Sequence, residues 1–171
     1  MVTRASRRQS LTVRPIVPGD FRFIRSLASI IDGYTVPSPY VSWMLGRFHG
    51  GLCAVAADTG HNRLGYVLAM PTSDPGDGVF VWQLAVTFRG RRLKAQDHLA
   101  AHLKKAMRAR NAHHLFFTTV PLSPTERSVT AIAKRVFHAS PAKGQRLPVS
   151  VSGAESEYDL VATITKVGKA R

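Results

Sequence analysis

Cysteine is nearly absent from this chain of 171 residues, in which Cys53 is the only example. A single cysteine excludes an intramolecular disulfide and a cysteine-rich metal site, and it is typical of a reducing compartment, so we expect a cytoplasmic protein. Because Cys53 lies in the apolar run from Leu52 to Ala57, a buried strand cysteine is favoured over a nucleophile.

Long apolar runs are also missing. No stretch approaches the ~18 to 20 apolar residues that a membrane span requires, and the opening MVTRASRRQS lacks the apolar centre of a signal peptide. We therefore predict no membrane span. With 44% hydrophobic residues, the chain can form one core but is too short for two ordinary domains. The expected organisation is a disordered basic arm over residues 1–10, one domain over residues 11–165 and a basic tail over residues 166–171.

Acidic residues are scarce, since 10 Asp and Glu stand against 24 Lys and Arg and give a net charge of +14. Such a charge favours a phosphorylated cofactor, a nucleic acid, an anionic membrane or an acidic protein as partner, and it fits equally a basic protein kept in solution by its charge. Nucleic acid is not favoured, because neither paired zinc ligands nor an aromatic ribonucleoprotein motif is visible. An acidic protein partner and a homodimer stay open.

The most informative stretch runs from Gly78 to Arg110, where the apolar run Val79–Val86 is followed by a basic segment and a helical pattern. The apolar run predicts a central strand that is covered on both faces. The basic segment, Arg89–Lys94, predicts a loop leading into a helix from about Ala95. Since free backbone N–H groups and the positive end of the helix would meet there, we expect a phosphate site.

The rest of the chain predicts strands and helices in alternation. Asp20 is expected to cap a helix through about Ile31, and Ser38 to cap a second helix with Pro39 in its first turn. Strands are predicted over Ser10–Val17, Leu52–Ala57, Arg63–Met70, Leu115–Val120 and within Val149–Ile164, with a helix over Thr125–His138 and, on the helix after the basic segment, a buried face of Leu99, Ala100, Leu103 and Met107. This order predicts a single α/β (α+β) domain whose mixed, mostly antiparallel central sheet has helices on both faces.

Local sequence in three places resembles one enzyme family. The strand Phe80-Val-Trp-Gln-Leu-Ala-Val86 is similar to the sequence FVWQVAV of the diaminobutyrate acetyltransferases of ectoine biosynthesis, members of the GNAT acyltransferase superfamily. Ser38-Pro-Tyr40, followed by Trp43–Phe48, resembles that family's asparagine-serine-x-tyrosine helix, and Thr118-Thr-Val120 resembles its threonine-threonine strand. The resemblance runs from about Val13 to Ile164 and implies a single GNAT-like domain.

The resemblance implies a coenzyme A dependent N-acetyltransferase that uses acetyl-CoA as cosubstrate and a small amine or amino acid, similar to diaminobutyrate, as acceptor. It assigns cofactor binding to Leu84, Ala85, Val86, Arg91, Arg92, Leu93, Lys94, Ala95 and Gln96, with the amides of the first and third residues on the thioester arm. It assigns substrate contacts to Ser38, Gln83, Thr118, Thr119, Glu155 and Glu157. Thr35 falls where the family carries an acidic residue.

Two aromatic residues are candidate catalytic groups. Tyr40 is a hypothesis for proton transfer or acceptor binding, and the alternative is a half-buried tyrosine that anchors its helix. Trp82 would border the acceptor pocket, and the alternative is plain core packing. No metal is expected, because His98 and His102 lie one helical turn apart without a third ligand, so solvated or phosphate-facing histidines are favoured.

The cofactor loop departs from the family pattern. Aligned without a gap, the family's arginine-glycine-x-glycine-x-glycine falls on Arg91–Gln96, which contains no glycine. Gly90 would compensate in part through a shift of one residue, and basic side chains would supply the phosphate charge. Two alternatives therefore remain beside the acetyltransferase. One is a non-catalytic GNAT-fold binding module, and the other is an acyltransferase that uses an acyl carrier protein thioester, whose acidic surface would suit the net charge of +14.

Overall fold

A computed structural model describes residues 10–31, 33–73, 77–119, 124–139, 146–151 and 154–164, with side chains described through residue 117 and over residues 127–139. The elements are β1 (Leu11–Pro15), a 3₁₀ turn η1 (Pro18–Asp20), α1 (Phe21–Ala28), α2 (Pro39–His49), β2 (Ala54–Asp58), β3 (Arg63–Pro71), β4 (Gly78–Val86), α3 (Phe88–Arg92), α4 (Ala95–Ala109), β5 (His114–Thr119), α5 (Pro124–Ile132), a π-helical turn η2 (Ala133–Phe137), β6 (Arg146–Val151) and β7 (Ala154–Ile164). The predicted arm up to residue 9 and the predicted tail lie outside the described residues.

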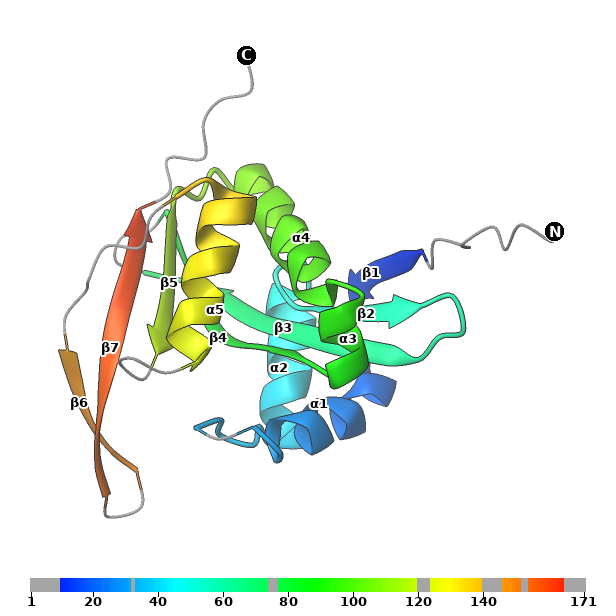
Figure 1. The fold of residues 1–171 in the computed structure, drawn as a ribbon, viewed down its shortest axis with the longest axis horizontal. Coiled ribbons are helices and arrows are strands. Elements are labelled where there is room, and N and C mark those ends of the chain that lie inside the picture. Colours follow the sequence, from blue (N-terminus) through cyan, green and yellow to red (C-terminus); the bar gives the residue numbers. More distant parts are fainter. Residues whose placement is uncertain are drawn as a thin grey trace, which may run out of the picture.

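The strands of the described residues form one sheet in the order β1-β2-β3-β4-β5-β7-β6 (Figure 1). Every neighbouring pair is antiparallel except β4 and β5, which run parallel. Because β5 is reached from β4 through helix α4, this parallel pair is the crossover that the strand-helix-strand pattern predicts. The predicted mixed, mostly antiparallel sheet is confirmed.

Helices cover both faces of the sheet, with α4 and α5 on one face and α1 and α2 on the other (Figure 1). On the α4 face, Leu99, Ala100, Leu103 and Met107 are all at most 1% exposed, which confirms the predicted buried face of that helix. On the opposite face, Ile24 of α1 and Leu45 of α2 pack with Tyr66 and Leu68 of β3. Strand β3 is therefore covered on both faces, and most of its residues are buried.

Local signals in the sequence account for several element ends. The Ser38 hydroxyl accepts a hydrogen bond from the Val41 N–H at 3.2 Å, and Pro39 opens α2, as predicted. Between β2 and β3, the Asp58 carboxylate accepts hydrogen bonds from the N–H groups of Gly60 and Asn62, each at 2.9 Å. That aspartate closes the turn between these antiparallel strands, and the hydrogen bonds from Asn62 lower the pKa of its carboxyl group.

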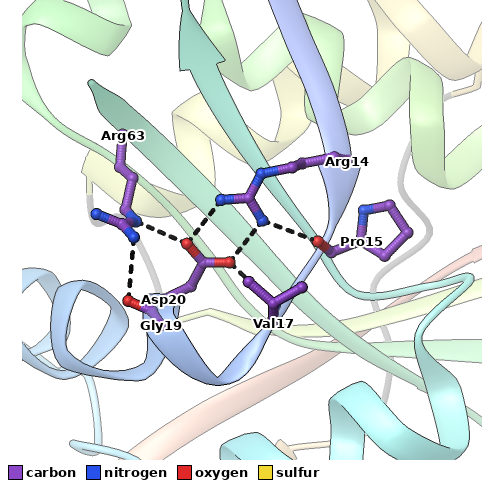
Figure 2. Close-up of polar contacts among 6 residues, drawn as sticks. All are labelled: Arg14, Pro15, Val17, Gly19, Asp20 and Arg63. Atoms are coloured by element: carbon purple, nitrogen blue, oxygen red, sulfur yellow. Dashed lines mark hydrogen bonds and ion pairs between the residues drawn. The ribbon is translucent and has the colours of Figure 1, made fainter. Parts of the chain in front are cut away.

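The expected helix after Asp20 is shorter than predicted, and the expected capping role of Asp20 is wrong. Helix α1 does begin directly after it, but it ends at Ala28 rather than near Ile31, and the Asp20 side chain makes no capping bond to α1. The carboxylate is fully buried and instead accepts hydrogen bonds from Arg14 at 2.7 and 2.8 Å and from Arg63 at 2.6 Å (Figure 2). Two charged donors bind a buried carboxylate more strongly than a neutral helix amide does, so the ion pairs displace the cap.

No helix among the described residues combines the length and the apolar character needed to cross a membrane.

Candidate active site

Strand β4 separates from β5 halfway along its length. The two strands pair only from Gly78 with His114 to Val81 with Phe117. Beyond that point β5 stays paired with β7, whereas β4 keeps only its other neighbour, β3. The register with β3 also shifts here, which leaves Trp82 as the extra residue of a bulge. The second half of β4 therefore has an edge that is free of strand pairing among the described residues.

The hydrogen-bonding pattern shows which peptide groups face this free edge. The Thr87 N–H donates to the Leu64 carbonyl of β3 at 2.8 Å, which marks a hydrogen-bonded position between the two strands. Such positions alternate along an antiparallel pair. The peptide groups of Ala85 therefore face β3, and those of Leu84 and Val86 face the free edge.

Tyr34 lies at this edge and was missed by the sequence reasoning. Its hydroxyl donates a hydrogen bond to the Leu84 carbonyl at 2.7 Å. Burial raises the pKa of the Tyr34 phenol, while the positive charge of Arg91 acts on the same pKa in the opposite direction. The phenol therefore keeps its proton at neutral pH. Tyr34 stands in a loop without hydrophobic periodicity, so the only available signal was a lone aromatic residue between two turns.

Gln83 holds the segment that carries Tyr34 against the sheet. Its amide nitrogen donates to the Thr35 carbonyl at 2.6 Å, and its amide oxygen accepts from the Tyr66 hydroxyl at 2.9 Å. The Gln83 side chain is only 4% exposed. Burial also raises the pKa of Tyr66, so its phenol keeps the proton that it donates to Gln83. Both ends of the amide are thus engaged within the protein, and Gln83 can act on a substrate through the position of Tyr34 and Thr35.

The other predicted acceptor residues lie in two different settings. Tyr40 is 67% exposed on the outer face of α2, with its ring centroid 6.1 Å from that of Trp43, so the alternative of a half-buried anchoring tyrosine is wrong. The Ser38 hydroxyl is engaged as the helix cap. Trp82 is half-buried and packs on the core between the sheet and the helices α1 and α2. These positions leave the proposed contacts of Tyr40 and Trp82 with a substrate as predictions.

The remaining predicted substrate residues are described only by their backbones. Thr118 and Thr119 of β5 pair with Leu160 and Asp159 of β7. Glu155 and Glu157 of β7 pair with Ser150 and Pro148 of β6. Their roles stay predictions. Among the described side chains, no cluster of three or more potential metal ligands occurs.

The basic segment differs from the loop that the sequence predicts, because Phe88–Arg92 form the short helix α3. The Thr87 hydroxyl caps it by accepting from the Gly90 N–H at 3.0 Å. The Leu93 N–H donates to the Arg89 backbone carbonyl at 3.1 Å, and the Lys94 N–H donates to the Arg91 backbone carbonyl at 3.1 Å. Both amides are therefore engaged within the segment. The cap at Thr87 and the close packing of Gly90 on β3 favour a helix over an open loop.

Three basic side chains of this segment, Arg91, Arg92 and Lys94, are exposed where α3 meets the start of α4. Arg89 differs from them, because its guanidinium pairs with the buried Asp58 carboxylate at 2.7 Å and ties α3 to the β2–β3 turn. Among the described residues these three cations have no acidic partner, so an anion at this junction would meet them and the N-terminus of the 15-residue helix α4.

Two positions of this segment bear on the missing glycines. Lys94, which stands at the second glycine of the family pattern, has a left-handed backbone with φ 57° and ψ 33°, a conformation that glycine adopts more readily than other residues. Gly90 is buried against β3, where an added Cβ would lie 2.2 Å from the Leu64 carbonyl oxygen. Gly90 therefore serves the packing of α3 on β3, and its expected compensation for the missing glycines stays a prediction.

A comparison of two substitutions at Lys94 tests the left-handed strain. We expect Lys94→Gly to be more stable to urea than Lys94→Ala by about 0.5 to 1 kcal/mol, because both remove the charge and only glycine adopts this conformation without cost. Equal stability of the two variants, or greater stability of the alanine variant, would contradict the left-handed conformation.

No family model matches the chain. An L-2,4-diaminobutyric acid acetyltransferase of Bordetella parapertussis is 29% identical over 119 residues, which is 70% of this chain and 64% of the relative. The chain thus spans less than two thirds of that curated relative's length. The diaminobutyrate acetyltransferase EctA of Paenibacillus lautus, solved with L-2,4-diaminobutyric acid and coenzyme A, superposes with a TM-score of 0.76 at 18% identity over 95% of this chain and 99% of that one.

A second solved structure, Ard1 of Thermoplasma volcanium, superposes with a TM-score of 0.73 at 16% identity over 90% of this chain and 97% of that one. The chain has the GNAT acetyltransferase fold. The predicted fold is therefore confirmed. At these levels of identity, the likeness carries the fold and leaves activity to be argued from the site.

Proposed function

We propose that the protein is a coenzyme A dependent N-acetyltransferase that transfers an acetyl group from acetyl-CoA to the amine of a small molecule. The observation that carries this proposal is the free edge of β4, where the peptide groups of Leu84 and Val86 face outward beside the cationic junction of α3 and α4. A ligand with an amide-rich arm and a phosphate end suits this pairing of a strand edge with free positive charges.

The residues of the junction fit the phosphates of such a ligand. Arg91, Arg92 and Lys94 would hold them, together with the first amides of α4 at Ala95 and Gln96. Acetyl-CoA, when bound, supplies a thioester-activated acetyl group. The free edge would hold the thioester arm through the N–H groups of Leu84 and Val86, which are fixed by the pairing of β4 with β3.

The reacting groups need orientation and a proton carrier. Tyr34 is the described side chain best positioned for the second task, since its protonated hydroxyl lies 2.7 Å from the Leu84 carbonyl. Gln83 would act as a positioning residue that holds Tyr34 and Thr35 in place. Trp82, at the bulge where the edge begins, would wall the acceptor side and limit access of water.

The first acceptor to test is L-2,4-diaminobutyrate, because the curated relative and one solved neighbour act on or bind it. With that acceptor, the protein would serve ectoine biosynthesis. Spermidine is a second amine to test, since a solved neighbour from Vibrio cholerae is a spermidine N-acetyltransferase. Release of the coenzyme A thiol, followed with acetyl-CoA and each amine in turn, measures the transfer. We expect amine-dependent release, fastest with diaminobutyrate.

One observation favours a second candidate, a non-catalytic GNAT-fold binding module. The N–H groups of Leu93 and Lys94 are bonded within their own segment and are not free to bind phosphate oxygens. Binding of acetyl-CoA without thiol release for any amine of the panel would support that candidate and contradict catalysis. Thiol release that needs an amine would exclude it.

Tyr34→Phe separates chemistry from binding. We expect kcat to fall by about 10- to 100-fold, because phenylalanine lacks the hydroxyl group that would carry the proton. The acetyl-CoA concentration at half-saturation should change little. Tyr40→Phe is the matched control from the same loop-helix unit. A larger fall in kcat for Tyr40→Phe than for Tyr34→Phe would instead support the earlier hypothesis for Tyr40.

A further inference from the structure

The exposed large apolar side chains are concentrated in one part of the chain, from the end of α1 through α2. Among the described residues, Ile30, Val36, Tyr40, Trp43 and Phe48 are each at least 41% exposed. Outside this region only Val17 and Phe88 are exposed to a similar extent among the described residues. Monomeric proteins seldom expose neighbouring large apolar side chains without a partner for them.

Three of these side chains form a continuous aromatic row along the outer face of α2. The ring centroids of Tyr40 and Trp43 lie 6.1 Å apart, and those of Trp43 and Phe48 also lie 6.1 Å apart, nearly perpendicular at 82°. The opposite face of α2 holds the buried residues Ser42 and Leu45. The packing of α2 on the core therefore presents the row outward.

A cavity of about 400 Å³ lies beside the start of this row, between α1 and the segment that leads into α2. Its polar lining comes from Arg22, Arg25 and Ser26 of α1 and from Ser29, which follows the helix. Its apolar lining comes from Phe21, Val36 and Pro39. Neither arginine has an acidic partner among the described residues, and both are exposed. The cavity thus offers two free guanidinium groups beside an apolar surface.

We propose that this α1–α2 surface docks an acidic protein segment, with carboxylates on Arg22 and Arg25 and apolar side chains on the Tyr40–Trp43–Phe48 row. Charge complementarity selects this occupant, because the protein carries a net charge of +14 and exposes a third arginine, Arg47, on α2, the helix that carries the aromatic row. Tyrosine, tryptophan and arginine are also the residues that most often carry binding energy at protein interfaces. The inference is independent of the proposed acetyl transfer.

Other occupants fit the surface less well. A second copy would bring two basic surfaces together, which is unfavourable for a chain with a net charge of +14. Stacking of nucleic-acid bases needs open ring faces, whereas the Trp43 ring lies between those of Tyr40 and Phe48. A bilayer surface has no side chain that could enter the cavity of about 400 Å³ beside the row.

The test uses a fluorescent helical peptide of alternating glutamate and leucine blocks, and fluorescence anisotropy at physiological salt with the full chain. We expect saturable binding that Arg22→Glu combined with Arg25→Glu weakens by about tenfold or more, and Trp43→Ala by about fivefold or more. Lys105→Glu combined with Arg108→Glu, exposed on α4, makes the same change in charge elsewhere and should alter binding by less than about twofold. Thermal melting verifies that each variant is folded.

Four outcomes would overturn the inference. Absence of peptide binding at millimolar concentration would contradict a docking surface. An equal loss of binding in the α4 control would show that binding depends only on the net charge of the protein. Tighter binding of a single-stranded oligonucleotide or of anionic phospholipid vesicles through the same residues assigns the surface to another partner. Dimers that sedimentation detects and Trp43→Ala abolishes assign it to a second copy. None of these results affects thiol release with amines, so the proposed enzyme activity is tested separately.

Discussion

Asp20→Asn is expected to lower the free energy of unfolding by about 3 kcal/mol, because it removes the charge of a buried carboxylate that pairs with two partly exposed arginines. The Asp20 carboxylate is fully buried, and its oxygens accept from Arg14, Arg63 and the Val17 N–H (Figure 2). An amide in its place accepts fewer of these bonds and leaves two guanidinium groups without a counter-charge. Urea denaturation of the variant and the wild type measures the difference.

The same ion pairs make stability depend on pH. Burial alone would raise the pKa of Asp20, but the hydrogen bonds from Arg14 and Arg63 outweigh it and lower the pKa to about 2 from the ordinary 3.8. A lowered pKa in the folded state stabilises the protein at every pH above the unfolded value. This contribution, on the order of 2 kcal/mol, should be lost as the pH falls from about 4 through about 2. In Asp20→Asn that part of the acid dependence should disappear.

Asp97→Asn is the matched control, because Asp97 pairs with Arg135 at an exposed site on the helical face. Exposed ion pairs contribute little, so we expect a loss below about 1 kcal/mol. If both asparagine variants lose the same stability, Asp20 is not the buried anchor that joins β1, α1 and β3.

Gly90→Ala should be the most damaging single-methyl change near the cationic junction. The added Cβ would lie 2.2 Å from the Leu64 carbonyl oxygen and 3.1 Å from its carbon, which are backbone atoms of β3 and cannot rotate away. Helix α3 would have to move outward, at a cost of about 2 kcal/mol or more. The displacement would also carry Arg91 and Arg92 away from the start of α4.

Gly51→Ala is the control for this change, because the nearest atom to its added Cβ is the Arg110 guanidinium at 3.9 Å. We expect it to leave the melting temperature almost unchanged. Both glycine variants should be examined by thermal melting with and without acetyl-CoA. A normal melting temperature for Gly90→Ala would show that α3 does not press on β3.

The sequence predicted most of the sheet and of the helices that cover it because hydrophobic periodicity records burial directly. The run Val79–Val86 became β4, and the spacing of Leu99, Leu103 and Met107 matched the buried face of α4. The hairpin between β2 and β3 was also predictable, since an Asp-Thr-Gly-His-Asn turn interrupts two apolar runs.

The differences arise where tertiary contacts override local signals. Asp20 matches a helix cap in sequence, yet its carboxylate accepts a hydrogen bond from Arg63, which is distant in the chain. The segment Phe88–Arg92 lacks a helical hydrophobic pattern and becomes α3 because Gly90 fits closely against β3. Tyr34 bonds to Leu84, which lies 50 positions further along the chain. Contacts of this kind leave no periodicity to detect.

Titration calorimetry of acetyl-CoA most directly tests the proposed site at the β4 edge and the α3–α4 junction. We predict one binding site per chain and a loss of affinity of about tenfold or more in Arg91→Ala combined with Arg92→Ala, since each removes charge-assisted hydrogen bonds to phosphate. Lys105→Ala combined with Arg108→Ala, on the exposed face of α4, should change affinity by less than about twofold. Absence of binding at millimolar acetyl-CoA, or equal affinity in the wild type and the Arg91, Arg92 variant, would contradict this site.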